Sequence, residues 1–515
     1  MLVCPYQFSN ILEGGRKKLS VEREQWGTRA GFILAAIGSA IGLGNIWRFP
    51  YAAYESGGGA FLIPYLFALL TAGIPVLILE FALGHKYRGS APLAMAKANP
   101  KFEWLGWWQV VVAFGIAVYY VGVIAWAISY TGFSLTQAWG ADPEGFFFGT
   151  YLGLAEGGLF DFGGFRVGIL IPLLIAWLIN FVVLYSGVRK GIELANKIFI
   201  PVLIFMILAI TVRGLTLPGA IDGLNYLFRP DFSAITNWEV WITAYGQIFF
   251  TLSIGFAIMT AYSSYLPKKS DIVNNGFITG LGNCGFSLLA GIGVFSIVGY
   301  MAHASGQPFE EVVTQSLGLA FVAFPSAISQ MPGSPALFGV LFFLSLVFAG
   351  LSSFISINEA CVSALMDKFG AARKKVVPIY CLVAGGISLW MATNAGLFFL
   401  DIVDHFCNSI GIVFGVIFEA LLIGWFFKIH VLKDHVNAIS DFPVGGWWPF
   451  TIKFVTIAIL GYSGIKNVIS DLTTPYGDYA WSSIIAVGWM VPILAIVLGV
   501  VLSSMGWKNR EVLRD

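Results

Sequence analysis

The stretch GSAIGLGNIWRFPY, Gly38 to Tyr51, decides the fold of this chain. It lies inside an apolar run that would otherwise form an ordinary membrane-spanning helix, yet it contains three glycines, an asparagine, an arginine and a proline. In lipid, backbone polar groups freed from a helix are costly, so such a stretch is stable only where it is buried in protein or lines a cavity. A broken helix at this depth is therefore a candidate binding site.

The composition indicates a membrane protein. The 515 residues are 57% hydrophobic and 11% charged, whereas soluble domains carry about 25% charged residues. The net charge of +1 and the lack of a long basic run give no support for nucleic-acid binding. The first 25 residues have no apolar core, so we expect no signal peptide. Five cysteines without metal-type spacing predict neither a disulfide framework nor a metal cluster.

Runs of roughly 20 apolar residues predict an all-α polytopic protein with twelve membrane spans. The predicted spans are 28–53, 59–85, 106–137, 167–186, 191–213, 239–264, 275–300, 335–366, 377–394, 399–428, 448–466 and 481–504. They organise the chain into a cytosolic tail (1–27), a first repeat (28–213), a second repeat (239–428), spans 11 and 12 (448–504) and a second cytosolic tail (505–515).

Charge predicts the orientation of the spans. All but five of the 29 Lys and Arg residues fall in the tails, in the odd-numbered loops or at the start of span 11. The exceptions are Arg48, Arg166, Arg213, Arg229 and Lys466. Cytosolic loops carry the excess of Lys and Arg in membrane proteins. We therefore expect both termini in the cytosol.

Three connecting segments have features of their own. Residues 86–105 carry four cations and predict an interfacial helix on the cytosolic side. The external segment 309–334 contains an apolar helical stretch that is too short to span the membrane and is expected to dip back onto the outer side. Residues 429–446 are interpreted as an ordinary polar cytosolic loop.

Spans 1 and 6 are the two that carry helix breakers among polar residues, GSAIGLGN in one and FFTLSIGF (249–256) in the other. Five spans separate them, which suits a 5+5 inverted repeat. Paired interrupted helices at corresponding positions indicate a transporter site at the membrane midplane. No direct identity between the halves is visible, so the repeat is an inference.

Span 8 supplies further oxygen atoms. Ser352 and Ser353 are adjacent, and Ala349 lies one turn earlier. Two hydroxyls and a freed carbonyl could join the carbonyls of span 1 around a hard cation such as sodium. The alternatives are that the serines bond back to their own helix and that Gly38-x-x-x-Gly42 is a helix-packing motif. Asn45, Arg48 and the second broken span favour the site.

At this point the chain resembles a known family. The segment from Arg23 to Phe61, with GQIFFTLSIGF (246–256), FAGLSSF (348–354) and the region of Asp404, is similar to spans 1, 6, 8 and 10 of the neurotransmitter:sodium symporter family (solute carrier 6 type). The segment is also close to the bacterial leucine-transporter type. The resemblance covers nearly the whole chain and implies the leucine-transporter-type fold with broken helices 1 and 6.

The resemblance implies two sodium sites and an amino acid site. Sodium site 1 would comprise Ala40, Asn45, Thr251 and Asn283, and sodium site 2 would comprise Gly38, Ile41, Ala349, Ser352 and Ser353. The substrate would contact Ala40, Leu43, Gly44, Ile116, Tyr120, Phe250, Thr251, Ser253, Phe256 and Ile357.

The resemblance also implies gates. Arg48 and Asp404 would close the outer side, with Phe250 as a lid beneath them, and the inner gate would consist of Arg23, Trp26, Tyr265 and Asp367. An ion pair that forms only in a closed state makes a reversible plug, since charges are costly to remove from water. The alternative for Arg48 is a snorkelling interfacial cation. Glu80 would be a structural brace that accepts hydrogen bonds from the unwound backbone of span 1.

Gly42 narrows the expected substrate. Monoamine-carrying relatives have an aspartate at this position, which replaces the carboxylate that their substrates lack. With glycine here, the ligand should bring its own carboxylate. The pocket residues are apolar, so the prediction is a neutral, hydrophobic amino acid.

Ser287 lies one turn after Asn283, at a place where the leucine-transporter pattern has a glutamate. Two sodium ions with a zwitterion leave excess positive charge, which is costly in a low dielectric. Chloride-dependent relatives have a serine at this place. The hypothesis is a chloride site made by Tyr65, Gln247, Thr251, Asn283 and Ser287; the alternative is that another acid or a proton balances the charge.

The sequence therefore predicts a sodium-coupled symporter that imports a neutral amino acid by alternating access, as a monomer or homodimer in a bacterial inner membrane. The alternative is a channel or a substrate-sensing binding protein on the same fold. An enzyme is not expected, because no nucleophile–base pair or nucleotide motif is present and the five histidines are scattered. The sequence leaves open which amino acid is carried and how many sodium ions accompany it. His405, the one histidine beside an acid, is expected in the outer vestibule.

Overall fold

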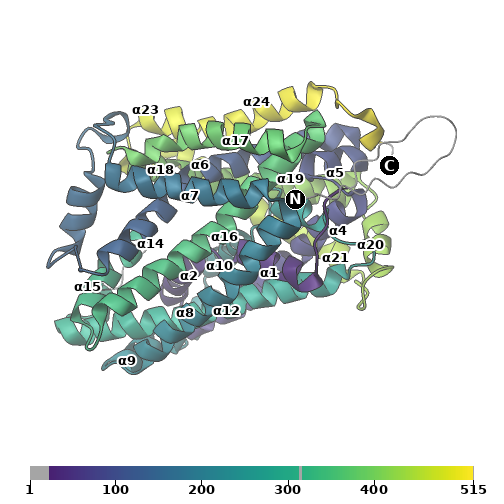
Figure 1. Ribbon diagram of the computed structural model, residues 1–515. Helices are drawn as coiled ribbons and strands as arrows, with labels where there is room; N and C mark the ends of the chain where they lie inside the picture. The colour runs from purple at the N-terminus through teal and green to yellow at the C-terminus, as the bar shows by residue number, and fades with distance from the viewer. Residues whose placement is uncertain (1–22, 313–315, 514–515) are drawn as a thin grey trace, which may run out of the picture.

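The computed structural model describes residues 23–312 and 316–513, and every regular element in these segments is a helix. Ten helical stretches are long and apolar enough to cross a membrane, and an eleventh span is a pair of helices bent by 54°. The helices form an elongated bundle (Figure 1). The prediction of an all-α polytopic membrane protein is confirmed.

The spans lie close to their predicted ranges. Span 1 comprises α1 and α2, and span 6 comprises α10 and α11. The principal helices are α1 (Arg29–Ala40), α2 (Leu43–Glu55), α3 (Leu62–Ala68), α4 (Ile74–Tyr87), α6 (Glu103–Phe133), α7 (Val167–Tyr185), α8 (Leu194–Leu215), α10 (Trp238–Thr251), α11 (Ile258–Ser263), α12 (Ile272–Ser305), α16 (Pro335–Phe369), α17 (Arg373–Ser388), α18 (Gly396–Phe406), α19 (Val413–Leu421), α22 (Ile457–Thr473) and α24 (Met490–Ser504).

The first break falls inside the stretch of sequence that predicted it. Thr28 caps the N-terminus of α1 by accepting a hydrogen bond from the Gly31 amide, and α1 ends at Ala40. Ile41 and Gly42 are extended, and α2 then starts in a new direction. Because two residues leave the helical conformation, the last carbonyls of α1 and the first amides of α2 lose their helical partners.

The second break separates α10 from α11 by the six residues 252–257. Three of these residues have positive φ angles: 54° at Ser253, 86° at Gly255 and 69° at Ala257. Left-handed backbone at non-glycine residues costs free energy and is found mainly where the surroundings enforce it, often at functional sites. Gly255 also packs directly against Val416 of α19, so a side chain there would collide.

Two long helices form the centre of the bundle. α16 packs along α6 and also contacts α1 and α8, and most of its residues from 349 to 364 are buried. The outer helices α7, α17, α22 and α24 instead expose many large apolar side chains, as expected for surfaces that face lipid. The second break lies inside this bundle, since residues 252–257 are all buried.

The connecting segments contain short helices. α5 (Ala91–Ala98) lies in the predicted interfacial segment, and α15 (Phe324–Gln330) completes the short apolar helical stretch of the external segment. The interpretation of 429–446 as a plain loop was wrong, because α20 (His430–Asn437) packs against α4 there. Leu432 and Val436 of α20 are buried, and this four-residue apolar spacing was too short a signal to predict the helix.

Candidate functional site

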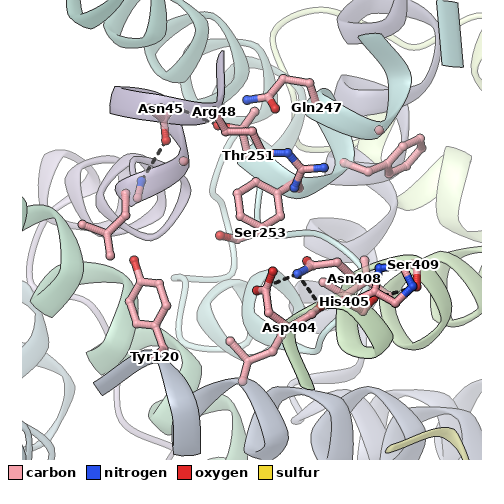
Figure 2. A pocket seen from close by; sticks show the side chains of 18 of the residues that line it. Asn45, Arg48, Tyr120, Gln247, Thr251, Ser253, Asp404, His405, Asn408 and Ser409 are labelled. Atoms are coloured by element: carbon pink, nitrogen blue, oxygen red, sulfur yellow. Dashed lines mark hydrogen bonds between the residues drawn. The ribbon is translucent and has the colours of Figure 1, made fainter. Parts of the chain in front are cut away.

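A cavity of about 540 Å³ lies around the two breaks. Residues from α2, α6, α10, α16 and α18 line it, so parts of the chain that are distant in sequence share one space (Figure 2). Its walls include every residue of the predicted substrate set: Ala40, Leu43, Gly44, Ile116, Tyr120, Phe250, Thr251, Ser253, Phe256 and Ile357.

The end of α1 presents four backbone carbonyls that have no helical partner, those of Gly38, Ser39, Ala40 and Ile41. Hydroxyl groups from the other broken span and from α16 bond three of them. Ser352 donates to the Gly38 carbonyl at 2.7 Å, and Ser253 donates to the Ser39 carbonyl at 2.8 Å. Ser353 lies 3.1 Å from the Ser39 carbonyl and 3.3 Å from the Ile41 carbonyl. In the described chain, the Ala40 carbonyl accepts none of these bonds.

The five residues predicted for sodium site 2 therefore lie together. Their oxygen atoms come from two helices, and Ser352 also approaches the Ala349 carbonyl at 3.0 Å. Within the described ranges, no group of three or more His, Cys, Asp or Glu residues could hold a metal ion. The cluster consists of carbonyl and hydroxyl oxygens without a carboxylate, which suits a hard monovalent cation.

Two of the residues predicted for sodium site 1, Thr251 and Asn283, meet the side chain of Asn45, whereas Ala40 makes no hydrogen bond to this cluster in the described chain. The Nδ2 of Asn45 donates to Thr251 Oγ1 at 2.8 Å, to Asn283 Oδ1 at 2.9 Å and to Ser287 Oγ at 2.8 Å. Its Oδ1 accepts a hydrogen bond from the Gly42 amide at 2.9 Å. Three side-chain oxygen atoms thus surround the NH₂ group of Asn45, which is the positive end of its amide dipole. The same oxygen atoms could bind a cation.

The predicted chloride residues include unpaired donors. Tyr65 Oη and both amide atoms of Gln247 are buried without a hydrogen-bond partner in the described chain, although each side chain is only 2% exposed. Buried polar atoms are nearly always paired in native proteins. The unpaired groups lie on α3 and α10, next to the Asn45 cluster that contains Thr251, Asn283 and Ser287.

The pocket leaves space at Gly42. A Cβ atom added there would lie 3.4 Å from Tyr120 Oη and 3.4 Å from Ser353 Oγ. A longer side chain would project between these groups. The hydroxyls of Ser253 and Ser353 are already directed at backbone carbonyls, so the wall offers a ligand side chain mainly apolar surface.

The predicted outer gate is present but unpaired in this structure. The Arg48 guanidinium lies 4.4 Å above the ring of Phe250. Asp404 instead accepts hydrogen bonds from Tyr119 at 2.6 Å and Asn408 at 2.8 Å. Arg48 and Asp404 both project into the cavity (Figure 2), and no ion pair joins them in the described chain.

The predicted inner gate is closed. Arg23 forms an ion pair with Asp367 at 2.8 Å and lies 5.0 Å above the ring of Tyr265. Trp26 is 4% exposed and donates from its indole to the Tyr262 carbonyl at 2.8 Å. The backbone amide of Trp26 also bonds the Tyr265 carbonyl at 3.1 Å. These contacts fasten the start of α1 to the end of α11.

The sequence reasoning missed a buried ionic cluster beside this gate. Glu359 of α16 is fully buried and accepts hydrogen bonds from Arg373 at 2.5 Å and from Tyr265 at 2.7 Å. Arg373 also pairs with Glu24 at 2.9 Å. The signal was present in the sequence, since an ionisable residue inside a span is functional by default and Glu359 lies inside span 8.

A second missed residue anchors the start of α1. Glu193 ends a π-helical turn (Val188–Glu193) that precedes α8. Its carboxylate accepts hydrogen bonds from the Gly27 amide at 2.6 Å and the Thr28 hydroxyl at 2.8 Å, and Lys197 pairs with it at 2.6 Å. Carboxylates stabilise helix N-termini, so Glu193 holds the N-terminal end of α1 against span 5.

The expected role of Glu80 needs a correction. Glu80 was expected to accept hydrogen bonds from the unwound backbone of span 1. In the described part of the chain, its one backbone amide donor is Gly255, at 2.6 Å, in the break of span 6. The brace therefore supports the other broken span, because the Gly255 amide is one of those that the break leaves free.

His405 lines the cavity, as expected for a vestibule residue. Its Nε2 lies 2.9 Å from Asp471 Oδ1, and its ring stacks on Tyr476 with 3.8 Å between centroids. These contacts tie α18 to α22 and to the loop that follows it.

Comparison with known proteins agrees with this geometry. The model of the sodium:neurotransmitter symporter family matches residues 23–144 and 140–509. A sodium-dependent transporter of Methanocaldococcus jannaschii, itself uncharacterized, is 46% identical to the chain, and the alignment covers 95% of this chain and 99% of that protein.

Animal proteins are similar at lower identity. The sodium-dependent dopamine transporter of Caenorhabditis elegans is 31% identical, with 94% of this chain and 85% of that protein aligned. The sodium- and chloride-dependent GABA transporter 2 of Rattus norvegicus is also 31% identical, with 96% of this chain and 88% of that protein aligned.

Proposed function

The chain belongs to the sodium:neurotransmitter symporter family, and from this membership we propose that it imports a neutral amino acid together with sodium ions. The family is one of sodium-dependent transporters and not of enzymes. The substrate, the number of sodium ions and the role of chloride are the proposed parts.

The observation that carries the proposal is the convergence of oxygen atoms at the break of span 1. The freed carbonyls from Gly38 to Ile41 face hydroxyls on one side, and the Asn45 cluster lies on the other. Both clusters adjoin the cavity that contains the substrate residues. Two cations bound here would share the backbone of one short segment with the substrate, which is a direct physical basis for coupling.

The amino acid assignment rests on Gly42 and on the N-terminus of α2. Helix N-termini attract anions through their free amides and their dipole, and Leu43 and Gly44 at this end line the cavity. A substrate carboxylate fits between this end and Tyr120. The apolar wall of Ile116, Phe256 and Ile357 favours a hydrophobic side chain.

Chloride is proposed as a third bound ion, beside two sodium ions, because the residues of its predicted site include donors without partners. Tyr65 and Gln247 are buried without partners, and an anion would accept hydrogen bonds from both. The alternative remains that an acid or a proton balances the sodium charge. The GABA transporter of Rattus norvegicus is named as sodium- and chloride-dependent, which is compatible with either choice for this chain.

The gates support alternating access. The inner ion pair of Arg23 and Asp367 is formed, whereas Arg48 and Asp404 are apart. Import would require the outer pair to form and the inner pair to break in turn. We also propose that both termini are cytosolic, that the membrane is a bacterial inner membrane and that the repeats occupy 28–213 and 239–428.

A panel of radiolabelled substrates in proteoliposomes tests the proposal. We expect uptake of at least one of leucine, alanine or tryptophan in sodium and not in potassium or choline, and a weaker uptake when gluconate replaces chloride. Strong transport of dopamine without any amino acid would contradict the substrate assignment. Uptake unchanged in gluconate would contradict the chloride site alone.

A further inference from the structure

Two glutamates from different spans lie buried beside the break of span 6. Glu80 belongs to α4 and Glu419 to α19, and both side chains are 0% exposed. The proposed sodium and substrate sites use neither carboxyl group. Charged groups inside a membrane protein are expensive and mark functional positions.

Each carboxyl group has one partner and one unpaired oxygen. Glu80 Oε1 accepts a hydrogen bond from the Gly255 amide at 2.6 Å, and Glu419 Oε2 accepts one from Gln109 Nε2 at 2.7 Å. Glu80 Oε2 and Glu419 Oε1 have no partner in the described chain. No Lys, Arg or His in the described ranges forms an ion pair with either group.

The helices that carry the two carboxyl groups meet at the broken backbone of span 6. Gly255, which Glu80 bonds, packs against Val416, one turn before Glu419 on α19. A Cβ added to Gly415 would lie 2.9 Å from the Gly255 carbonyl. Glu80 thus bonds the backbone segment against which the turn of α19 that precedes Glu419 packs.

Among the described residues packed around the two glutamates, no cation compensates their negative charge. α6 presents Gln109 to Glu419, and α11 presents Ser263, whose hydroxyl lies 3.4 Å from the Glu80 carbonyl. The nearest histidine along α4 is His85, more than one turn away, and its ring bonds Pro267 and His435. Ionising both carboxylates in a site that is closed to water and lacks a cation is strongly unfavourable.

We propose that Glu80 and Glu419 form a proton site that holds one proton between them. The proton lies on Glu419 Oε1 and is donated to Glu80 Oε2, which pairs both unpaired oxygens with one hydrogen bond. Glu80 carries the negative charge, because it accepts the short bond from the Gly255 amide and hydrogen bonds to a carboxylate favour its ionised form.

The site connects proton binding to the broken span. The Gly255 amide stabilises the negative charge only while residues 252–257 keep their present conformation. A movement of span 6 that withdraws this amide raises the affinity of the pair for a second proton, and a movement that strengthens the contact lowers it. The pair therefore links pH to the conformational cycle of the proposed transporter, independently of the identity of its substrate.

Infrared difference spectroscopy of the full-length protein in lipid tests the site without sodium or substrate. Wild-type protein should show the C=O stretch of a protonated carboxylic acid with the deuterium shift of an exchangeable proton. Glu419→Gln should remove this band, since the glutamine amide replaces the protonated group. Glu239→Gln is the matched control, because Glu239 is exposed and paired with Lys466 at 2.6 Å, and it should leave the band unchanged.

A band that persists in both Glu419→Gln and Glu80→Gln, or no such band in wild-type protein, would overturn the proposal. Transport gives a second readout. Wild-type uptake should fall at alkaline pH, where the pair loses its proton and holds two charges, and Glu419→Gln should keep its uptake to at least one pH unit higher. Equal alkaline limits for the two proteins would also contradict the proton site. Because the infrared test needs no transport, its failure leaves the symporter assignment unaffected. Failure of the uptake panel likewise leaves the infrared result for the proton site unaffected.

Discussion

At the scale of the residue, Asn45 joins the broken span 1 to spans 6 and 7. Its Nδ2 lies among three side-chain oxygens, and its Oδ1 caps the Gly42 amide. A cation that entered site 1 would displace the amide nitrogen and would need the Asn45 oxygen to turn towards it. An amide suits this position because one side chain both donates to the neighbouring spans and accepts from the broken backbone.

Ser353 gives the first prediction at this scale. Its hydroxyl is within 3.5 Å of three carbonyls at the end of α1, so Ser353→Ala should weaken sodium binding by about tenfold, as expected for the loss of one polar ligand. Sodium titration of substrate binding measures the effect. Ser345→Ala is the control, because Ser345 is also buried on α16 and its hydroxyl bonds the Phe342 carbonyl of its own helix. Equal sodium affinity in both variants would remove Ser353 from the site.

Gly42 gives the second prediction at the scale of the residue. Gly42→Asp should reduce amino acid uptake by about 100-fold, since a carboxylate placed between Tyr120 and Ser353 would repel the substrate carboxylate in a poorly solvated site. Gly42→Ala adds only the Cβ, at ordinary contact distances of 3.4 Å, and should keep most of the activity. Amino acid uptake kinetics compare the two. If the alanine variant lost as much activity as the aspartate variant, space rather than charge would matter here.

At the scale of the element, the start of α1 is fastened on two sides. On one side, Arg23 pairs with α16 and Trp26 bonds α11. On the other side, Glu193 of span 5 accepts hydrogen bonds from the amide and the hydroxyl of the two residues just before α1. In the proposed alternating access, opening of the inner side would require all these contacts to break. The turn that carries Glu193 is π-helical, and such turns are frequent at functional sites.

Glu193→Ala should loosen this fastening. We expect amide hydrogen exchange in residues 23–31 to become about tenfold faster, because the Gly27 amide loses its acceptor and the inner gate opens more often. Lys190→Ala, an exposed change in the same turn, should leave the exchange rate as in wild type. Protection that is equal in all three proteins would show that Glu193 does not hold α1.

α20 gives a pH dependence of stability. Burial and the neighbouring His85 lower the pKa of His435 to about 4. His85 donates from Nε2 to the Pro267 carbonyl, so His435 donates to His85 Nδ1 while both rings are neutral. The unfolded chain binds the proton at about pH 6.5, so stability should fall as pH decreases from about 6.5 to 4.

The loss is about 1 kcal/mol, because His435 is only partly shielded from solvent. Thermal unfolding in detergent measures it, and His435→Gln should flatten the decrease over this pH range. A wild-type midpoint that is constant from pH 6.5 to 4 would contradict a buried neutral His435.

At the scale of the whole molecule, the sequence predicted the architecture well, because spans are marked by long apolar runs and breaks by glycine and polar residues. Asn45, Ser352 and Ser353 stand out in the sequence for the same reason, since they are polar residues in apolar surroundings, whereas the other members of the predicted sites came from the resemblance to the family. The partners of Glu80, Glu193 and Glu359 were not predictable. They depend on which helix faces which, and hydropathy carries no information about neighbours in a bundle.

The state of the gates was also beyond the sequence. Arg48 and Asp404 are compatible with a closed or an open outer side, and only the placement of α2 against α18 decides between them. The structure separates this pair while the inner pair is formed. A sequence can contain the residues of both ion pairs, but it does not say which of the two pairs is formed.

The central claim is that sodium drives accumulation of a neutral amino acid. Proteoliposomes containing potassium buffer and a trace of the best substrate from the uptake panel should be diluted into sodium buffer, with gramicidin added in a parallel sample to dissipate the gradient. We expect the internal amino acid to rise above its external concentration only while the sodium gradient persists. An internal concentration that merely equals the external one, with or without gramicidin, would contradict coupled transport.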